Sequence, residues 1–330
     1  MVSIQGALLC ALCILSGPAA SVDRPDATGN TPPAVSGAAA PSSQQPDRQG
    51  FLYEVSVPEG RFQNLPAGAR LVLFGTIHVD RSGARVLNAQ STRELEGAQR
   101  VALEADPRDA QTVARLARQY GYYADGDLLD HHVPAADVLA AREILLDEGA
   151  SLVGVTQTKP WLMSFVLTSA KLAHDGFSAT MGSEWTLATF AAQRSIPIVE
   201  IEGFESQFSL FDHQSADLQR AQLEESINEI RSGELVDETR ALVRAWHAAD
   251  GDTLRTQLTA MEHDQAPFGR FTIEQLINMR DRSMADRAEE YLRQGGTTFF
   301  AVGCLHLFGD AGLVAELARR GYRVRDLQAS

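Results

Sequence analysis

The stretch RLVLFGTIH, residues 70–78, decides the fold class, because an apolar run ends there in glycine and histidine follows three positions later. Near the C-terminus the stretch TFFAVGCLH, residues 298–306, repeats this pattern. Runs so nearly continuous in Val, Leu and Phe are typical of parallel strands covered by helices on both faces. Glycine permits a tight exit, and open α/β sheets bind ligands beyond the carboxyl ends of their strands. We therefore expect His78 and His306 to meet at one edge of a sheet.

Two further apolar runs predict buried parallel strands, at residues 100–104 (RVALE) and 196–201 (IPIVEI). Longer segments between the strands have apolar residues at three-and-four spacing, which predicts helices. The expected fold is α/β, or α+β, with a central, largely parallel sheet flanked by helices and a large helical insertion before the last strand. The predicted helices cover residues 135–146, 161–173, 216–230 and 273–292.

The composition is that of a globular protein. Of its 330 residues, 44% are hydrophobic and 22% are charged, which gives ample apolar material for one sizeable core. The formal net charge of −14 makes nucleic acid and anionic membrane surfaces poor candidates for partners. The longest apolar run is too short to cross a bilayer, so we expect no membrane span.

The chain divides into three predicted parts. Residues 1–21 combine a short apolar run with a helix breaker and small residues, which predicts a signal peptide and an exported protein, periplasmic or secreted. Residues 22–50 are rich in Pro, Ala and Ser, and so poor in large apolar side chains that we expect a disordered tether. Residues 51–330 contain no further break of that kind and predict a single domain.

A carboxylate follows the apolar residues 101–103 at the end of the predicted strand 100–104, much as the histidines come after the ends of their strands. This residue is Glu104. Two neutral imidazoles and a carboxylate suit a divalent transition metal, and an open coordination position would let the ion activate a water molecule. The pattern predicts His78, His306 and Glu104 as metal ligands, with Glu104 acting either as a ligand or as the general base. Weaker candidates of the same kind are Asp80, Asp106 and Glu202.

Arg280 lies on the apolar face of the predicted helix 273–292, so its charge must be paired or must reach a cleft. Arg280 either forms a structural ion pair or acts as a catalytic group that stabilises developing negative charge. Cys304 is a weak candidate nucleophile, since a buried thiol at a strand end is the commoner case. Other histidines lack the strand-end context and are expected to be surface or structural: His131, His132, His174, His213, His247 and His263.

Through these residues the chain resembles the TraB/GumN family, which includes pheromone-shutdown proteins, GumN-like proteins and the animal Tiki proteases. The chain departs from the family pattern at Asp281, where Asn is usual, at Cys304, where a smaller residue is commoner, and at residues 182–184 (GSE), where Gly-x-Asp is frequent. The likeness covers about residues 51–327 and rests on GTIH (75–78), LE (103–104), KPW (159–161), IEGFESQ (201–207), AWH (245–247), GD (251–252), RD (280–281), VGCLHLFG (302–309) and GYRV (321–324).

The resemblance implies an active or metal site built from the two G-x-x-H histidines and the strand-end glutamate, here His78, His306 and Glu104, with Arg280 nearby. It implies a metal-dependent, peptidase-like hydrolase with a peptide or protein substrate and with manganese or cobalt as cofactor, while zinc suits the same ligands. An ester or lactone is the next choice of substrate. The alternatives are a periplasmic protein that binds a metal or haem without catalysis, and an inactive interaction module on the same fold.

Overall fold

A computed structural model describes residues 49–58, 65–81 and 83–328. The predicted signal peptide, residues 1–21, and all but the last two residues of the predicted tether lie outside this described part of the chain. Among the described residues, no helix combines the length and the apolar character needed to span a membrane.

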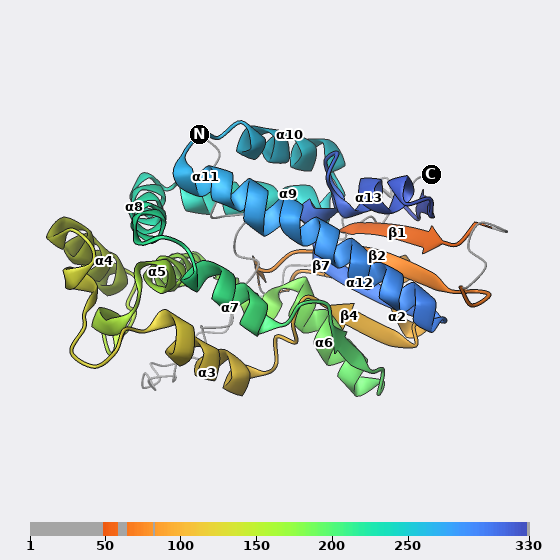
Figure 1. Ribbon diagram of the computed structural model, residues 1–330, viewed down its shortest axis with the longest axis horizontal. Helices are drawn as coiled ribbons and strands as arrows, with labels where there is room; N and C mark the ends of the chain where they lie inside the picture. The colour runs from red at the N-terminus through yellow and green to blue at the C-terminus, as the bar shows by residue number, and fades with distance from the viewer. Residues whose placement is uncertain (1–48, 59–64, 82, 329–330) are drawn as a thin grey trace, which may run out of the picture.

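A six-stranded sheet forms the centre of the molecule, in the order β6-β4-β7-β2-β1-β8 (Figure 1). The four strands β6, β4, β7 and β2 are parallel, while β1 runs antiparallel to β2 and β8. The predicted fold class, a largely parallel sheet flanked by helices, is confirmed. The strands are β1 (Phe51–Ser56), β2 (Arg70–Thr76), β4 (Arg100–Leu103), β6 (Ile198–Glu200), β7 (Thr297–Gly303) and β8 (Arg323–Asp326).

Strand β6 corrects one expectation, because the run at residues 196–201 does not form a strand buried on both faces. It contributes three residues at the edge of the sheet, and none of them is buried. The strands that the apolar pattern did not identify include β8, whose sequence RVRD is mostly exposed and is held extended by pairing with β1. A second, two-stranded sheet pairs β3 (Asp80–Arg81) with β5 (Phe177–Ser178).

The predicted helices all form, and the segment between β6 and β7 is helical as expected. The helix expected from residue 273 begins as a π-helix at Thr272–Met279 and continues as α12. The α-helices are α2 (Ala89–Glu96), α3 (Ala110–Gly121), α4 (Ala135–Asp147), α5 (Pro160–His174), α6 (Ser183–Gln193), α7 (Phe204–Asp212), α8 (Ala216–Ser232), α9 (Glu234–His247), α10 (Gly251–Glu262), α11 (Pro267–Phe271), α12 (Arg280–Gln294) and α13 (Leu313–Arg319).

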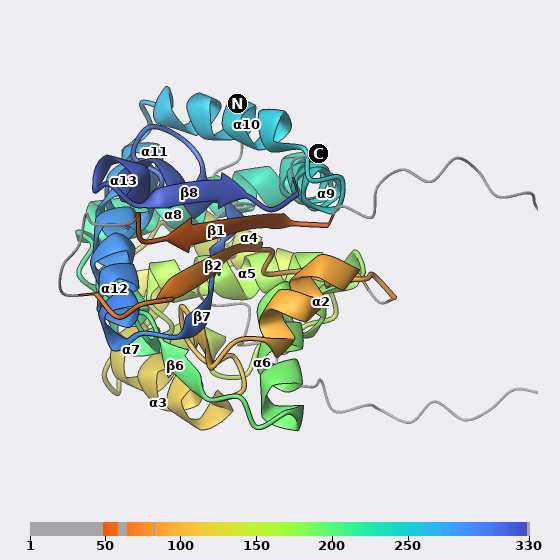
Figure 2. The same cartoon turned by 90° about the vertical axis from the view of Figure 1, so that its right-hand side faces the viewer.

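Helices cover both faces of the sheet, which explains why its central strands are apolar throughout. Helix α12 packs against β2 and β7 on one face, and α2 lies on the other face (Figures 1 and 2). Apart from its first residue, β7 is buried along its whole length, as is β2. Because α12 crosses the central strands, side chains on its inner face reach the carboxyl ends of those strands.

Candidate functional site

The two G-x-x-H motifs leave neighbouring parallel strands. In the register of β2 and β7, Gly75 lies opposite Val302 and Thr76 opposite Gly303. The other side of β7 pairs with β4, after which Glu104 follows. The motifs also pack closely, since a Cβ atom built on Gly75 would lie 3.1 Å from the Cβ atom of Cys304. The structure therefore brings the three predicted residues to one edge of the sheet, as the strand-end pattern indicated.

His306 is completely buried and forms a pair with a buried acid from α12. Its Nδ1 atom lies 2.6 Å from Oδ1 of Asp281. A carboxylate at this position favours the proton on Nδ1, which leaves the lone pair on Nε2. The Nε2 atom is buried and has no hydrogen-bond partner among the described residues. Burial raises the pKa of Asp281, although the charges of His306 and Arg280 oppose that rise.

His78 also lies against a carboxylate, at ion-pair distance. Its Nδ1 atom lies 2.5 Å from Oε1 of Glu184, in the first turn of α6. The loop that carries His78 is fixed to the same helix, because the backbone N–H of Ile77 donates to the Ser183 hydroxyl at 2.7 Å and the Ser183 N–H donates to the Ile77 carbonyl at 2.8 Å. Glu184 and Asp281, which stand out in the sequence as departures from the family pattern, are thus the two acids that orient the histidines.

The approach of α6 to His78 depends on Gly182, which gives a first prediction. A Cβ atom at position 182 would lie 2.4 Å from the carbonyl oxygen of His78, a contact with rigid backbone. We expect Gly182→Ala to lower the free energy of unfolding by about 1–3 kcal/mol, because the loop must shift away from Glu184. Denaturant unfolding measures this change.

The matched control is Gly97→Ala. Gly97 has a φ of −81°, and the nearest atom to its added Cβ would lie 3.5 Å away. We expect this substitution to change the free energy of unfolding by no more than about 0.5 kcal/mol. Equal effects of the two substitutions would contradict the assigned role of Gly182.

Glu104 is buried and its carboxylate accepts hydrogen bonds from three groups. One oxygen accepts the Gly303 N–H at 2.7 Å, and the other accepts from Arg280 and, at 3.3 Å, from the Gln207 amide. Burial by itself raises the pKa of Glu104, but the charge of Arg280, with those of His306 and His78 and the Gly303 hydrogen bond, lowers it to about 2. Glu104 is therefore ionised at neutral pH, and both motif histidines lie close enough to influence it.

Arg280 lies between two carboxylates. Its guanidinium bonds Glu104 and also Glu202, with Nη2 at 2.7 Å and Nε at 3.0 Å from Oε2 of Glu202. Backbone hydrogen bonds from Glu202 and Gly203 to the carbonyl of Glu104 hold the two acids side by side. The structure thus shows the ion-pair alternative for Arg280, and it gives Glu202, a weaker candidate in the sequence, a place in the same network.

The remaining candidates from the sequence, Asp80, Asp106 and Cys304, contact other residues. Asp80 is buried and pairs with His247 at 2.7 Å, which agrees with a structural role for that histidine. Asp106 pairs with Arg108 at 2.6 Å in its own loop. Cys304 is buried against Gly75. None of these contacts includes His78, Glu104 or His306.

Some features of the side chains at the strand ends suit a divalent metal, and others do not. Metal-binding histidines commonly donate their second ring N–H to a carboxylate, which is the arrangement of His306 with Asp281. The Nδ1 atom of His78 lies at ion-pair distance from Oε1 of Glu184. The buried Nε2 atom of His306 is a suitable donor. Within the described residues, no group of three or more His, Cys, Asp or Glu side chains is arranged to hold a metal ion. Glu104 as the third ligand therefore stays a prediction.

Comparison with known proteins places the chain among bacterial relatives. A family model described as the TraB/PrgY/gumN family matches residues 65–326. The chain is 22% identical over 254 residues to the uncharacterized protein YbaP of Escherichia coli (strain K12), covering 76% of this chain and 88% of that protein. The uncharacterized YbaP of Shigella flexneri matches to the same extent. No solved structure gives a significant match.

Proposed function

The chain belongs to the TraB/PrgY/gumN family, and from this premise and the geometry of the site we propose that it is an exported, metal-dependent hydrolase acting on a peptide or protein. The observation that carries the proposal is the pair of acid–imidazole contacts, His78 with Glu184 and His306 with Asp281, at the ends of adjacent strands. Two histidines, each beside a carboxylate of its own, and an ionised glutamate are side chains of the kind that catalytic metal sites use.

The roles of the residues follow from their contacts. His78 and His306 would hold the ion, manganese or cobalt by family likeness and zinc by ligand type. When bound, such an ion supplies an activated water and polarises a scissile carbonyl. The hydrogen bond with Asp281 would fix the His306 ring with its proton on Nδ1, and the Glu184 carboxylate lies against Nδ1 of His78.

Glu104 contributes a fixed negative charge that attracts a cation. A pKa of about 2 makes Glu104 a weak base at neutral pH, which favours an electrostatic or ligand role over that of general base. Arg280 orients Glu104 and Glu202. The sequence also suggested that Arg280 stabilises negative charge in the transition state. That role would be additional to the orientation of the two carboxylates.

The experiment that tests the proposal uses the full chain purified from its exported form without chelator. Elemental analysis measures bound metal, and mass spectrometry follows cleavage of a mixture of synthetic peptides with and without added Mn²⁺, Co²⁺ or Zn²⁺. We expect near-stoichiometric metal and metal-dependent cleavage that EDTA abolishes and the metal restores. Metal or haem uptake without cleavage would overturn the hydrolase in favour of a binding protein, and the absence of both would favour an interaction module.

A further inference from the structure

Helix α4 carries apolar side chains on two opposite faces. The helix packs against α5 and α8. Its outer face carries Leu139 and Leu146, which are both 61% exposed and lie two helical turns apart. A helix at the surface of a globular protein normally places polar residues on its solvent face, so the outer face of α4 is unusual. The inner face is formed by four buried residues: Ala140, Ala141, Ile144 and Leu145.

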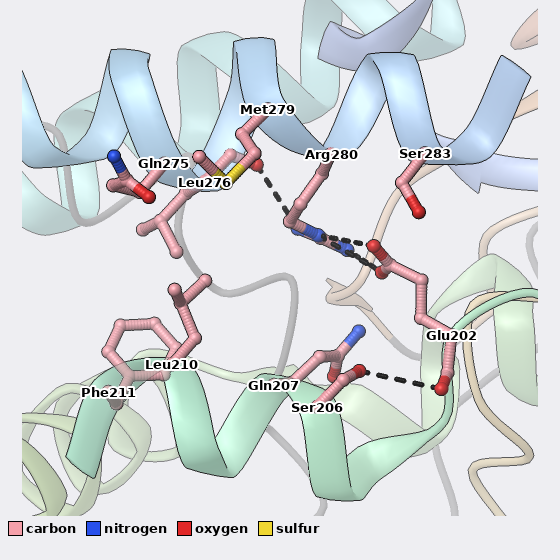
Figure 3. Close-up of a pocket in the computed structure, with 10 residues that line it drawn as sticks. All are labelled: Glu202, Ser206, Gln207, Leu210, Phe211, Gln275, Leu276, Met279, Arg280 and Ser283. Carbon is pink, nitrogen blue, oxygen red and sulfur yellow. Dashed lines mark hydrogen bonds and ion pairs between the residues drawn. The ribbon is translucent and has the colours of Figure 1, made fainter. Parts of the chain in front are cut away.

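The exposed apolar side chains of the protein gather at this helix. Among the residues that the structure describes, the three most exposed large apolar side chains are Leu139, Leu146 and Val153, which lies in the loop after α4. Met279 is also exposed, but it lines a pocket of about 220 Å³ with Leu210 and Leu276 of its own chain (Figure 3). Figure 1 shows α4 at one end of the molecule, away from the central sheet. Apolar surface gathered in such a place marks an interaction site.

Two opposite charges lie between the two leucines. Arg142 and Glu143 are exposed, and they come three and four positions after Leu139 and four and three positions before Leu146. Residues at this spacing share one face of a helix. The outer stripe, defined as Leu139, Arg142, Glu143 and Leu146, is therefore apolar, positive, negative and apolar in order along α4.

This order makes the outer stripe complementary to a second copy of itself that runs antiparallel. In a dimer with a two-fold axis every contact occurs twice, once from each copy. An axis that passes between Arg142 and Glu143 sets Leu139 opposite the second copy's Leu146, and Arg142 opposite the second copy's Glu143. Apolar groups then meet apolar groups and each charge meets its opposite. The sequence of the outer stripe thus identifies a second copy of this chain as the fitting partner.

The charged groups of the outer stripe are accessible to a second copy. Glu143 accepts a hydrogen bond from Arg231 of α8 at 2.9 Å, and these two side chains are 66% and 53% exposed. That contact is made by Oε2 of Glu143, and a carboxylate has a second oxygen that can accept from another guanidinium. Arg142 is exposed on the neighbouring position and supplies the N–H donors of such a guanidinium.

We propose that the protein forms a two-fold symmetric homodimer in which the outer stripes of two α4 helices pack antiparallel. The inference goes beyond the proposed hydrolase function and does not depend on it, because the outer stripe contains none of the strand-end residues. One helix from each copy buries less than the roughly 800 Å² per partner of a standard interface. We therefore expect a reversible dimer with a Kd in the micromolar range.

Sedimentation velocity of the full chain measures the oligomeric state at protein concentrations from about 1 to about 500 µM, which bracket a micromolar Kd. Each copy has a formal net charge of −14, so the buffer contains about 0.15 M salt to screen long-range repulsion. We expect the mass to rise from that of one chain to that of two as the concentration increases.

Charge reversal tests the antiparallel register. Arg142→Glu sets acidic groups opposite acidic groups, and Glu143→Arg sets basic groups opposite basic groups, so each should raise the Kd of the dimer about 10-fold or more. The double variant Arg142→Glu with Glu143→Arg restores opposite charges at both contacts. It should dimerise as the parent does.

Mixing the two single variants gives an independent test of the same contact. At a concentration at which each variant alone is monomeric, an equal mixture of Arg142→Glu and Glu143→Arg should form a mixed dimer, because the acidic stripe of one meets the basic stripe of the other. Leu139→Glu combined with Leu146→Glu should abolish dimerisation in any background. The matched control is Arg255→Glu on α10, where Arg255 is 55% exposed and pairs with Asp252, and it should leave the equilibrium unchanged.

The outcomes decide the assignment. A parent chain that stays monomeric over the whole concentration range would overturn it, as would a dimer that survives the leucine substitutions. A dimer that the single charge reversals weaken but that neither the double variant nor the mixture restores would show that the antiparallel register is wrong. Equal weakening by Arg255→Glu would show that the charge effects are not specific to α4.

Every readout of this experiment is a mass and none is an activity. A protein that dimerises as expected and cleaves no peptide would support the α4 dimer and count against the hydrolase. A monomeric protein that cleaves peptides would overturn the dimer and leave the hydrolase in place.

Discussion

Replacing Arg280 with methionine is expected to lower the free energy of unfolding by about 3–5 kcal/mol at neutral pH, which is the usual effect of leaving buried charge without its partner. Glu104 and Glu202 both contact the guanidinium, and both side chains are at most 10% exposed. Without Arg280 the two carboxylates would face each other in a site with little solvent. Denaturant unfolding of the parent and the variant measures the difference.

The loss of stability should depend on pH in a defined direction. In the parent, Glu104 has a folded-state pKa of about 2 against an ordinary 4.5, so its contribution to stability is complete above about pH 4.5 and is lost as the pH falls toward 2. Without Arg280, we expect burial, the largest single cause, to outweigh the remaining causes that lower the pKa of Glu104 and to raise its folded-state pKa above the ordinary value. The variant then loses stability as the pH rises, so the deficit should grow between about pH 4 and pH 7.

Two further variants make this prediction specific. Glu202→Gln combined with Arg280→Met should recover part of the loss at neutral pH, because one of the two facing charges is removed. Arg220 is 45% exposed and pairs with Asp217 one turn away on α8, so Arg220→Met should cost no more than about 0.5 kcal/mol. A similar cost for Arg220→Met and Arg280→Met would show that burial of the network contributes little.

Replacing His306 or His78 with asparagine is expected to reduce kcat/KM for a cleaved peptide by about 10²-fold or more while the fold is retained. The asparagine amide offers an N–H close to the position of Nδ1, so the contact with Asp281 or Glu184 can persist. What the substitution removes is Nε2, the atom that the proposal assigns to the metal. Kinetics on the peptide identified in the cleavage screen measure the effect, together with metal content.

A matched control is His263→Asn. His263 is exposed, and its Nδ1 atom lies 2.7 Å from the carbonyl of Thr259 on its own helix. The same chemical change at this position should alter kcat/KM by less than about 2-fold. If His306→Asn and His78→Asn both retain the parent activity and metal content, the Nε2 atoms have no part in catalysis and the mechanism is wrong.

The sequence predicted the strand ends well because strand exits are local properties of the chain. An apolar run followed by glycine identifies a buried strand and its end, and this was enough to bring His78, Glu104 and His306 to one edge of the sheet. The pattern failed where burial depends on neighbours. Residues 196–201 are as apolar as a central strand, yet only three of them pair at the sheet edge, and the charged β8 is a strand because β1 lies beside it.

The sequence by itself determined the fold class, the family and the three residues that follow the strands, since short stretches identify the strand ends and motifs along residues 51–327 identify the family. Only the tertiary structure decided which side chains contact these three residues. Asp281 reaches His306, Glu184 reaches His78 and Gln207 reaches Glu104 from helices distant in sequence. The physical reason is that a hydrogen bond or an ion pair requires its two atoms to lie within about 3–4 Å, and such a distance is set by how helices dock on the sheet.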